Sequence, residues 1–218
     1  MKTAIIAGAS GLTGSFLLKQ LLYSNIYSEV KALVRKPLDI EHPVLKQVNW
    51  DFENPNPEEI RADHVYCSLG TTMKKAGSKE KFRKVDYEYP LQLARMAYDR
   101  GTKKIALVSA VGANSKSLFF YNKVKGKLEE DLKKIPFEAI YIFRPSMLLG
   151  SRQEFRLGEE AGKAVMKTFS FILPDNLKPI HVSQVAQSML DYMNREEKGV
   201  QLIQSKQMLK YSTTSTSE

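Results

Sequence analysis

The chain of 218 residues has few of the residues that mark several large protein classes. Its single cysteine, Cys67, cannot form an internal disulfide, which excludes a disulfide-stabilised secreted domain and indicates a reducing compartment. Its three histidines, His42, His64 and His181, lie far apart and match no metal-ligand spacing, so we expect no metal site. We therefore predict a cytoplasmic protein in which Cys67 is a buried structural thiol, because it lies within an apolar strand.

The chain also lacks long apolar runs, and its acidic residues are fewer than its basic ones. No apolar stretch approaches the ~20 residues that span a bilayer, and Gly8 interrupts the apolar amino terminus, so we expect no signal peptide and no membrane partner. The balance of 33 basic to 24 acidic residues gives a net charge of +9. The densest basic cluster, residues 74–84, holds one aromatic, Phe82, on a helical apolar stripe. Base stacking needs exposed aromatics, so we interpret the cluster as a solvated face that could steer an anionic ligand rather than as a nucleic-acid site.

Strand and helix patterns alternate along the chain. Apolar runs predict strands at 4–7, 30–35, within 44–52, and at 65–69, 105–109 and 139–143. Steps of three and four predict helices at 16–22, 79–101, 120–135, near 158–170 and at 183–194. This alternation predicts an α/β fold with a doubly wound, mainly parallel sheet of the Rossmann type. We expect one domain over 1–204, in which 150–182 form a small lid or substrate region, and a frayed tail over 205–218.

The first predicted strand runs directly into a glycine-rich turn and a helix. Such a turn lets backbone N–H groups and a helix N-terminus meet a pyrophosphate without interference from side chains. An incidental glycine-rich loop is the alternative, and the flanking strand and helix favour the dinucleotide site. The predicted phosphate-binding residues are Gly8, Ser10, Gly11, Leu12, Thr13 and Gly14.

The end of the second predicted strand bears on which dinucleotide binds. Arg35 follows Gly14 by 21 positions, and Lys36 comes next, where an acidic residue would favour NAD. A guanidinium there suits a 2′-phosphate, so we predict NADP(H), the alternative being two solvated cations. Asp51 could reach the adenine amino group or could serve as a turn residue. The segment 69–72 should run beside the cofactor ribose, since parallel strands end on one side; its residues are Leu69, Gly70, Thr71 and Thr72.

Tyr121 and Lys125 supply a pair suited to carbonyl chemistry. Residues i and i+4 share a helix face, and an ammonium group can stabilise a phenolate that serves as proton donor. A second pair at this spacing, Tyr27 and Lys31, lies away from the carboxyl edge of the sheet, so we assign catalysis to Tyr121 and Lys125 and expect Lys125 also to hold the cofactor ribose. The alternative is a surface tyrosine beside an ordinary lysine. Ser109 at the end of the fifth strand is the candidate for orienting a substrate carbonyl. Two serines of the following loop, at 115 and 117, remain alternatives.

Several segments together resemble the atypical short-chain dehydrogenase/reductase family, and within it the NADPH-binding Tat-interacting-protein-like oxidoreductases and their bacterial relatives. The segments that carry the resemblance are 8–14, 69–72, Val85-Asp86, 108–113, Tyr121 with Lys125-Gly126, and Phe143-Arg144-Pro145. The resemblance implies an NADP-type Rossmann domain with Pro145 next to the nicotinamide and Tyr121, Lys125 and a serine in the active site. Ala110 departs from the second serine that relatives often carry, which makes turnover less secure than cofactor binding.

These observations predict an NADPH-dependent oxidoreductase that reduces a small carbonyl or sugar-type molecule by hydride transfer assisted by Tyr121 and Lys125. The alternative is a non-catalytic NADPH-binding redox sensor or a module that docks a regulatory partner, as the resemblance also implies. The helix pattern is equally compatible with a monomer and with a homodimer.

Overall fold

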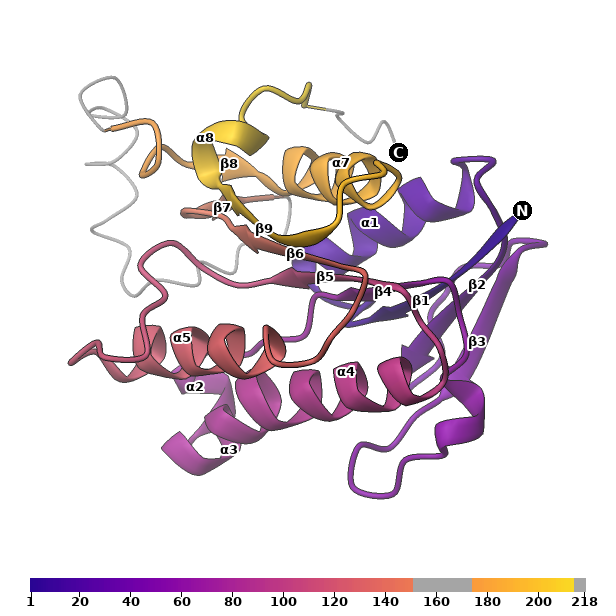
Figure 1. Cartoon of the computed structure of the whole chain (residues 1–218), viewed down its shortest axis with the longest axis horizontal. Coiled ribbons are helices and arrows are strands. Elements are labelled where there is room, and N and C mark those ends of the chain that lie inside the picture. The colour runs from indigo at the N-terminus through magenta and orange to yellow at the C-terminus, as the bar shows by residue number, and fades with distance from the viewer. Residues whose placement is uncertain (151–173, 214–218) are drawn as a thin grey trace.

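Seven parallel strands form the central sheet of the computed structural model, which describes residues 1–150 and 174–213 (Figure 1). Their order across the sheet is β3-β2-β1-β4-β5-β6-β9. The strands are β1 (Lys2–Ala7), β2 (Tyr27–Val34), β3 (Leu45–Asn49), β4 (His64–Cys67), β5 (Lys104–Val108), β6 (Ala139–Arg144) and β9 (Gly199–Gln204). A separate pair, β7 (Leu148–Leu149) and β8 (Ile180–His181), is also parallel. The predicted doubly wound parallel sheet is confirmed.

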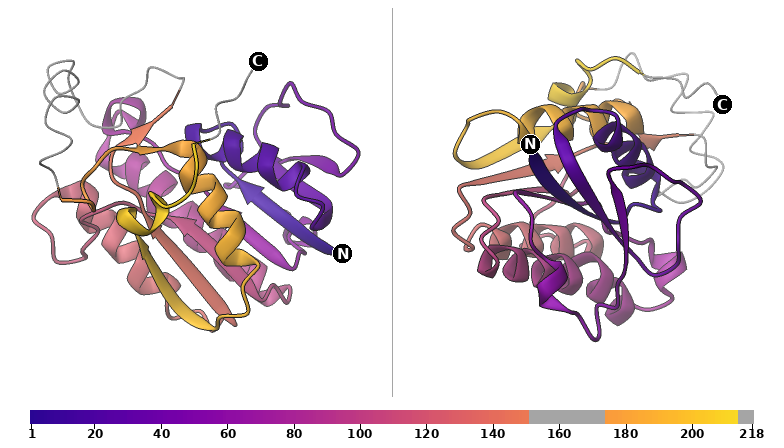
Figure 2. Two further views of the ribbon diagram at one scale, coloured as in Figure 1. Left: turned by 90° about the horizontal axis from the view of Figure 1, so that it is seen from above. Right: turned by 90° about the vertical axis from the view of Figure 1, so that its right-hand side faces the viewer.

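Helices cover both faces of the sheet, as the views in Figures 1 and 2 show. One layer holds α1 (Leu12–Leu22) and α7 (Val182–Met193), and the other holds α4 (Tyr89–Asp99) and α5 (Phe120–Leu132). The shorter helical segments are a 3-10 turn (Pro57–Glu59), α2 (Met73–Ala76), α3 (Lys79–Arg83), a π-helical turn (Lys84–Glu88) and α8 (Ser205–Met208). Because helices cover both faces of the sheet, the central strands β1, β4, β5 and β6 are mostly buried on both sides.

The core divides into two layers according to the alternation of side chains along each strand. Ile6 and Ala106 point toward α1 and α7, whereas their neighbours Ile5 and Ile105 point toward α4 and α5. All four are at most 1% exposed. Burying both faces of the strands in this way fixes the sheet and thereby the positions of the loops at its carboxyl edge.

Three differences from the sequence predictions have physical reasons. The helix predicted over 79–101 is divided by the π-helical turn Lys84–Glu88, whose extra residue per turn a 3.6-residue periodicity does not register. Strand β9 was not predicted, since its residues are largely exposed at the sheet edge and lack an apolar run. The prediction of a frayed tail over 205–218 is wrong for its first residues. Helix α8 buries Ser205 and Met208, and the carbonyl of Tyr211 accepts a hydrogen bond from Gln184.

The predicted helix at 183–194 is confirmed as α7. Most of the predicted lid, 150–182, and the helix predicted near 158–170 lie outside the described residues. Within the described ranges, no helix is long and apolar enough to cross a membrane.

Candidate functional site

The sheet has a topological switch point between β1 and β4, where the strand order reverses. From β1 the chain adds β2 and β3 on one side, then returns to place β4 on the other. In open α/β sheets, ligands bind at this switch point. The glycine turn, the loop after β4 and the start of α5 all belong to this edge, so the predicted cofactor residues and the predicted catalytic pair lie at one end of the sheet.

The glycine turn is closed too tightly for side chains at two of its positions. Gly8 has φ of +90°, and a Cβ on Gly14 would lie 2.0 Å from the carbonyl oxygen of Gly8. The backbone N–H of Gly11 donates to that same carbonyl over 2.9 Å. Ser68, at the end of β4, lies against the turn and donates its hydroxyl to the carbonyl of Ala7 over 3.1 Å. This packing places α1 directly beyond the turn with no side chain between them.

The N-terminus of α1 has the features of an anion site. Its N-cap residue is Gly11, which provides no side-chain cap, and the first N–H groups of a helix have no intrahelical partner. The Oγ1 atom of Thr13 is buried and has no hydrogen-bond partner within residues 1–150 and 174–213. A pyrophosphate would satisfy these donors and gain from the positive end of the helix dipole. The residues present therefore fit a dinucleotide.

Arg35 and Lys36 follow the last residue of β2 and are exposed, as is Ser10 within the glycine turn. Neither cation forms an ion pair with any part of the chain that the structure describes. Asp51 accepts hydrogen bonds from the backbone N–H of Glu53 over 2.9 Å and from Asn54 over 3.1 Å, and these bonds lower the pKa of its carboxyl. Of the two roles predicted for Asp51, these hydrogen bonds therefore favour that of a turn residue over contact with adenine.

A buried ion pair lies beneath the loop that follows β4. Lys125 Nζ is 2.8 Å from Asp86 Oδ1, and the two side chains are 3% and 1% exposed. The other oxygen of Asp86 accepts the backbone N–H of Thr71 over 2.7 Å. One carboxylate in the π-helical turn thus holds both the lysine of α5 and the loop predicted to run beside the cofactor. The next residue in that loop, Thr72, caps α2 by accepting the N–H of Lys75.

Tyr121 lies in the first turn of α5, one turn before Lys125. Its ring packs against Phe82 with centroids 5.7 Å apart, and its side chain is half-buried. The hydroxyl has no hydrogen-bond partner within the described ranges. A phenol in this position is held by its ring and keeps its donor and acceptor capacity for another molecule.

Ser109 is engaged inside the protein. It is 4% exposed and donates its hydroxyl to Glu129 over 2.5 Å. Glu129, itself 1% exposed, accepts two hydrogen bonds from Arg144, which joins α5 to the end of β6. The two alternative candidates for orienting the substrate also form hydrogen bonds within the protein: Ser115 donates to Glu130, and Ser117 accepts the N–H of Phe119.

The loop after β5 is fixed along the end of β6. The N–H of Ser109 donates to the carbonyl of Phe143 over 2.7 Å, and that of Val111 donates to the carbonyl of Pro145 over 2.9 Å. Pro145 therefore lies at the carboxyl edge beside this loop, and it is buried. The hydrogen bonds of the loop order the backbone between the end of β5 and α5.

Two carboxylates of this edge were not predicted as site residues. Asp86 and Glu129 are both buried at helical positions; Asp86 follows the buried Phe82 by one turn, and Glu129 lies next to the buried Leu128. A charged residue on the apolar stripe of a helix is the signal that could have identified each, because burial of a carboxylate requires a partner.

Cys67 and the histidines behave as structural residues. Burial raises the pKa of the Cys67 thiol to about 11, consistent with the predicted inert thiol. Among the described residues, no group of histidine, cysteine and acidic side chains could hold a metal ion.

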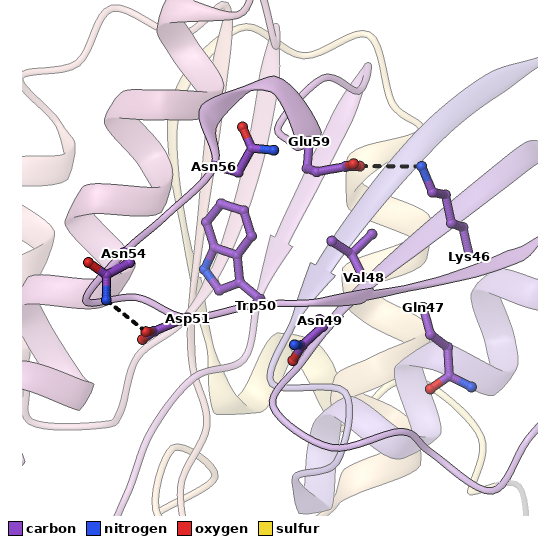
Figure 3. A pocket seen from close by; sticks show the side chains of 9 residues that line it. All are labelled: Lys46, Gln47, Val48, Asn49, Trp50, Asp51, Asn54, Asn56 and Glu59. Carbon is purple, nitrogen blue, oxygen red and sulfur yellow. Dashed lines mark hydrogen bonds and ion pairs between the residues drawn. The ribbon is translucent and has the colours of Figure 1, made fainter.

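A polar hollow of about 500 Å³ lies beside the edge strand β3 (Figure 3). Its lining residues are Lys46, Gln47, Val48, Asn49, Trp50, Asp51, Asn54, Asn56 and Glu59. It shares Asp51 with the predicted cofactor site but contains no residue of the glycine turn. The ion pair of Lys46 with Glu59, over 3.3 Å, crosses it.

Comparison with known proteins identifies relatives over nearly the whole chain. The HIM1 family model matches residues 21–174, more than half of the sequence. Protein HTATIP2 of Rattus norvegicus is 35% identical, with 95% of this chain and 88% of that protein covered. The mitochondrial protein FMP52 of Candida albicans is 33% identical, with 88% of each chain covered. The residues matched by the family model include Tyr121 and Lys125.

Solved structures share the fold at low sequence identity. MoeE5 in complex with UDP-glucose and NAD has a TM-score of 0.70 at 14% identity, covering 93% of this chain and 76% of that one. UDP-glucose 4-epimerase of Thermotoga maritima has a TM-score of 0.66 at 16% identity, covering 95% and 80%. Both comparisons support the Rossmann architecture.

The names of the fungal relatives correct one prediction. FMP52 proteins of Candida albicans, Debaryomyces hansenii and Saccharomyces cerevisiae are described as mitochondrial, which contradicts the expectation of a cytoplasmic protein. A lone cysteine reports the redox state of a compartment and does not distinguish one reducing compartment from another. The family resemblance is confirmed: the chain belongs to the HIM1 family, together with HTATIP2 and FMP52, and has a Rossmann-type fold.

Proposed function

We propose that this protein is an NADP(H)-dependent oxidoreductase that reduces a small carbonyl or sugar-type molecule. The observation that carries the proposal is a glycine turn closed to side chains at the same sheet edge as Tyr121, Lys125 and Asp86. MoeE5, which shares the fold, is described in complex with NAD and a nucleotide sugar. That description supports a nicotinamide dinucleotide here and leaves the substrate to experiment.

The preference for NADP(H) rests on Arg35 and Lys36. Two exposed cations at the end of β2 suit a 2′-phosphate, whose charge near −2 a guanidinium binds in two hydrogen bonds. We expect Arg35→Asp to weaken NADPH binding at least tenfold and NADH binding far less. Arg61→Asp is the matched control, since Arg61 is equally exposed but precedes β4 at the opposite edge. Equal losses for both coenzymes in Arg35→Asp would remove the assignment.

Tyr121 is the proposed proton donor. A bound nicotinamide would supply a hydride to the carbonyl carbon, while the Tyr121 hydroxyl transfers its proton to the carbonyl oxygen to give an alcohol. The hydroxyl has no partner in the described parts of the chain, and its half-exposed position lets water return the proton. Lys125 lies one helical turn after Tyr121 on α5, and its ammonium group, which Asp86 holds, would stabilise the tyrosinate.

The phenol can be tested by removing one atom. Tyr121→Phe should lower the rate of NADPH oxidation with a panel of aldehydes, ketones and sugar nucleotides by 10²-fold or more, roughly the contribution of a positioned acid. NADPH binding, measured by calorimetry, should change little. Tyr98→Phe, at an exposed tyrosine of α4, is the matched control. Unchanged turnover in Tyr121→Phe would exclude the assigned role.

A non-catalytic NADPH-binding protein is the second candidate, and one observation favours it. The Ser109 hydroxyl predicted to orient the substrate is buried and donates to Glu129. If wild type binds NADPH but oxidises it with no member of the panel, the sensor or docking function takes precedence. Ser109→Ala separates the two: a loss of turnover supports a substrate-orienting serine, and a loss of stability alone supports a structural one.

A further inference from the structure

Two large apolar side chains project from the turn before α5. Leu118 is 100% exposed and Phe119 is 75% exposed, although such side chains usually pack against others. The backbone beneath them is ordered, since the Phe119 N–H donates to Ser117 and its carbonyl accepts the N–H of Lys123 over 2.9 Å. We call Leu118 and Phe119 the apolar tip. The turn holds these side chains outward rather than allowing them to fold back.

The helices α2 and α3 lie beside the apolar tip. Phe120, the next residue, packs against Phe82 of α3 with centroids 5.7 Å apart, and the ammonium of Lys79 lies over the Phe120 ring at 5.5 Å. Figure 1 shows α2 and α3 next to the first turn of α5. Met73, the first residue of α2, is 39% exposed and adds apolar surface. The tip and the basic cluster predicted from the sequence therefore share one corner of the molecule.

This corner is basic. Neither 64–79 nor 100–128 contains an aspartate or a glutamate. Exposed cations of these segments and of α3 belong to this corner, and we call them the basic collar: Lys74, Lys79, Lys81, Lys116 and Lys123. Glu80 is the one acidic residue of α3. The two projecting apolar side chains therefore lie at a positively charged corner.

We propose that the apolar tip and the basic collar form a docking site for an anionic membrane surface. Phenylalanine and leucine insert into the boundary between headgroups and acyl chains, while lysines beside them attract acidic headgroups. A protein partner would need roughly 20–30 residues on each side for a stable interface, which a two-residue projection does not offer. The expected absence of a membrane partner was based on spanning segments, and a surface attachment needs none.

Vesicle sedimentation tests the proposal with the full-length protein. It should bind phosphatidylcholine vesicles that contain phosphatidylglycerol, bind vesicles of phosphatidylcholine alone much less, and lose affinity at high salt. The double variant Leu118→Ser with Phe119→Ser should weaken binding about tenfold or more. The double variant Lys74→Glu with Lys79→Glu should weaken vesicle binding by at least about fivefold for each lysine replaced.

A control variant and a fluorescent reporter make the test specific. Tyr23→Ser removes an aromatic that is 71% exposed beyond α1, outside the collar, and should leave vesicle binding unchanged. Phe119→Trp places a reporter in the tip, and its emission should shift to the blue on vesicle addition. The wild-type protein, whose only tryptophan is the buried Trp50, should show no such shift.

Three results would overturn the proposal. One is the absence of binding to either vesicle. Another is loss of binding in the lysine variant but not in the tip variant, which would indicate attraction of a polyanion without insertion. The last is a concentration-dependent dimer in sedimentation equilibrium that the tip variant abolishes, which would assign the tip to a second copy of the chain.

Discussion

The two edges of the parallel sheet handle polar groups in opposite ways. At the amino edge, the Tyr27 hydroxyl lies 2.8 Å from His64 Nδ1 and 2.7 Å from the Tyr66 hydroxyl, and all three residues are at most 3% exposed. At the carboxyl edge, the Thr13 hydroxyl and the Tyr121 hydroxyl have no partner in the described ranges. One edge satisfies its polar groups internally, and the other keeps donors for a ligand.

This contrast separates a region that stabilises the fold from the region of the proposed site. A satisfied polar cluster fixes β1, β2 and β4 where these strands begin, far from the proposed chemistry. At the carboxyl edge, the buried Asp86–Lys125 pair holds the loop and α5 that flank the proposed site. The hydrogen bonds of Glu129 with Ser109 and Arg144 join α5 to the ends of β5 and β6. Substitutions at the two edges should therefore separate folding from ligand binding.

The largest expected effect comes from breaking the buried pair. Asp86→Ala leaves Lys125 charged and buried without its carboxylate, and we expect it to lower the free energy of unfolding by about 3–5 kcal/mol. Urea denaturation measures this change. Glu53→Ala breaks the exposed pair with Lys84 and should change stability little, since solvent screens such pairs. Similar effects for the two variants would show that burial of Asp86 is energetically unimportant.

Adding a methyl group to the glycine turn should reduce coenzyme binding at the carboxyl edge while leaving the amino edge intact. A methyl group on Gly14 would meet the Gly8 carbonyl at 2.0 Å, whereas one on Gly11 would meet it at 3.1 Å. Gly14→Ala should therefore weaken NADPH binding by about 100-fold or more, equivalent to about 2.7 kcal/mol, and Gly11→Ala should have a smaller effect. Calorimetry, with thermal unfolding of each variant as a check on folding, gives both values. Tight NADPH binding by a folded Gly14→Ala variant would contradict the proposed site.

Lowering the pH should destabilise the protein through His64 at the amino edge. Burial, together with the charges of Lys2 and Lys104, lowers the pKa of His64 to about 3, against an ordinary value of 6.5. Between these values the unfolded chain binds a proton that the folded chain does not, so stability falls as the pH falls. His64 should contribute a loss of about 2 kcal/mol between pH 7 and 5. His64→Gln should remove that loss in urea denaturation, and a wild-type slope in the variant would refute it.

The smallest effect should follow from removing one hydroxyl of the amino cluster. Tyr27→Phe loses the hydrogen bonds to His64 and Tyr66 and should cost about 1–2 kcal/mol of stability. NADPH affinity should stay within twofold of wild type, because the cluster lies at the opposite edge. Tyr23→Phe, at an exposed ring, is the control for stability. A large loss of coenzyme affinity in Tyr27→Phe would show that the edges are coupled.

Local patterns in the sequence were sufficient for β1 to β6, the glycine turn and the position of Tyr121 on α5. Contacts between distant segments were not predictable in this way. Asp86 meets Lys125 only because a π-helical turn rotates it inward, and that turn interrupts the periodicity from which the helix was predicted. Ser109 was correctly placed at the end of a strand, but the carboxylate that accepts its hydrogen bond lies 20 residues later on α5. Partners of this kind follow from how helices pack on the sheet.

The packing of α1 on α7 has a consequence for synthesis of the chain. The first helix lies beside a helix that begins at Val182, with Phe16 against His181 and Gln20 donating to the carbonyl of Ser183 (Figure 2). Translation proceeds from the amino terminus, so the apolar side of residues 12–22 has no native cover until residues 182–193 have also left the ribosome. During that interval a nascent chain would depend on chaperones, and premature termination before 182 would release a fragment prone to aggregation.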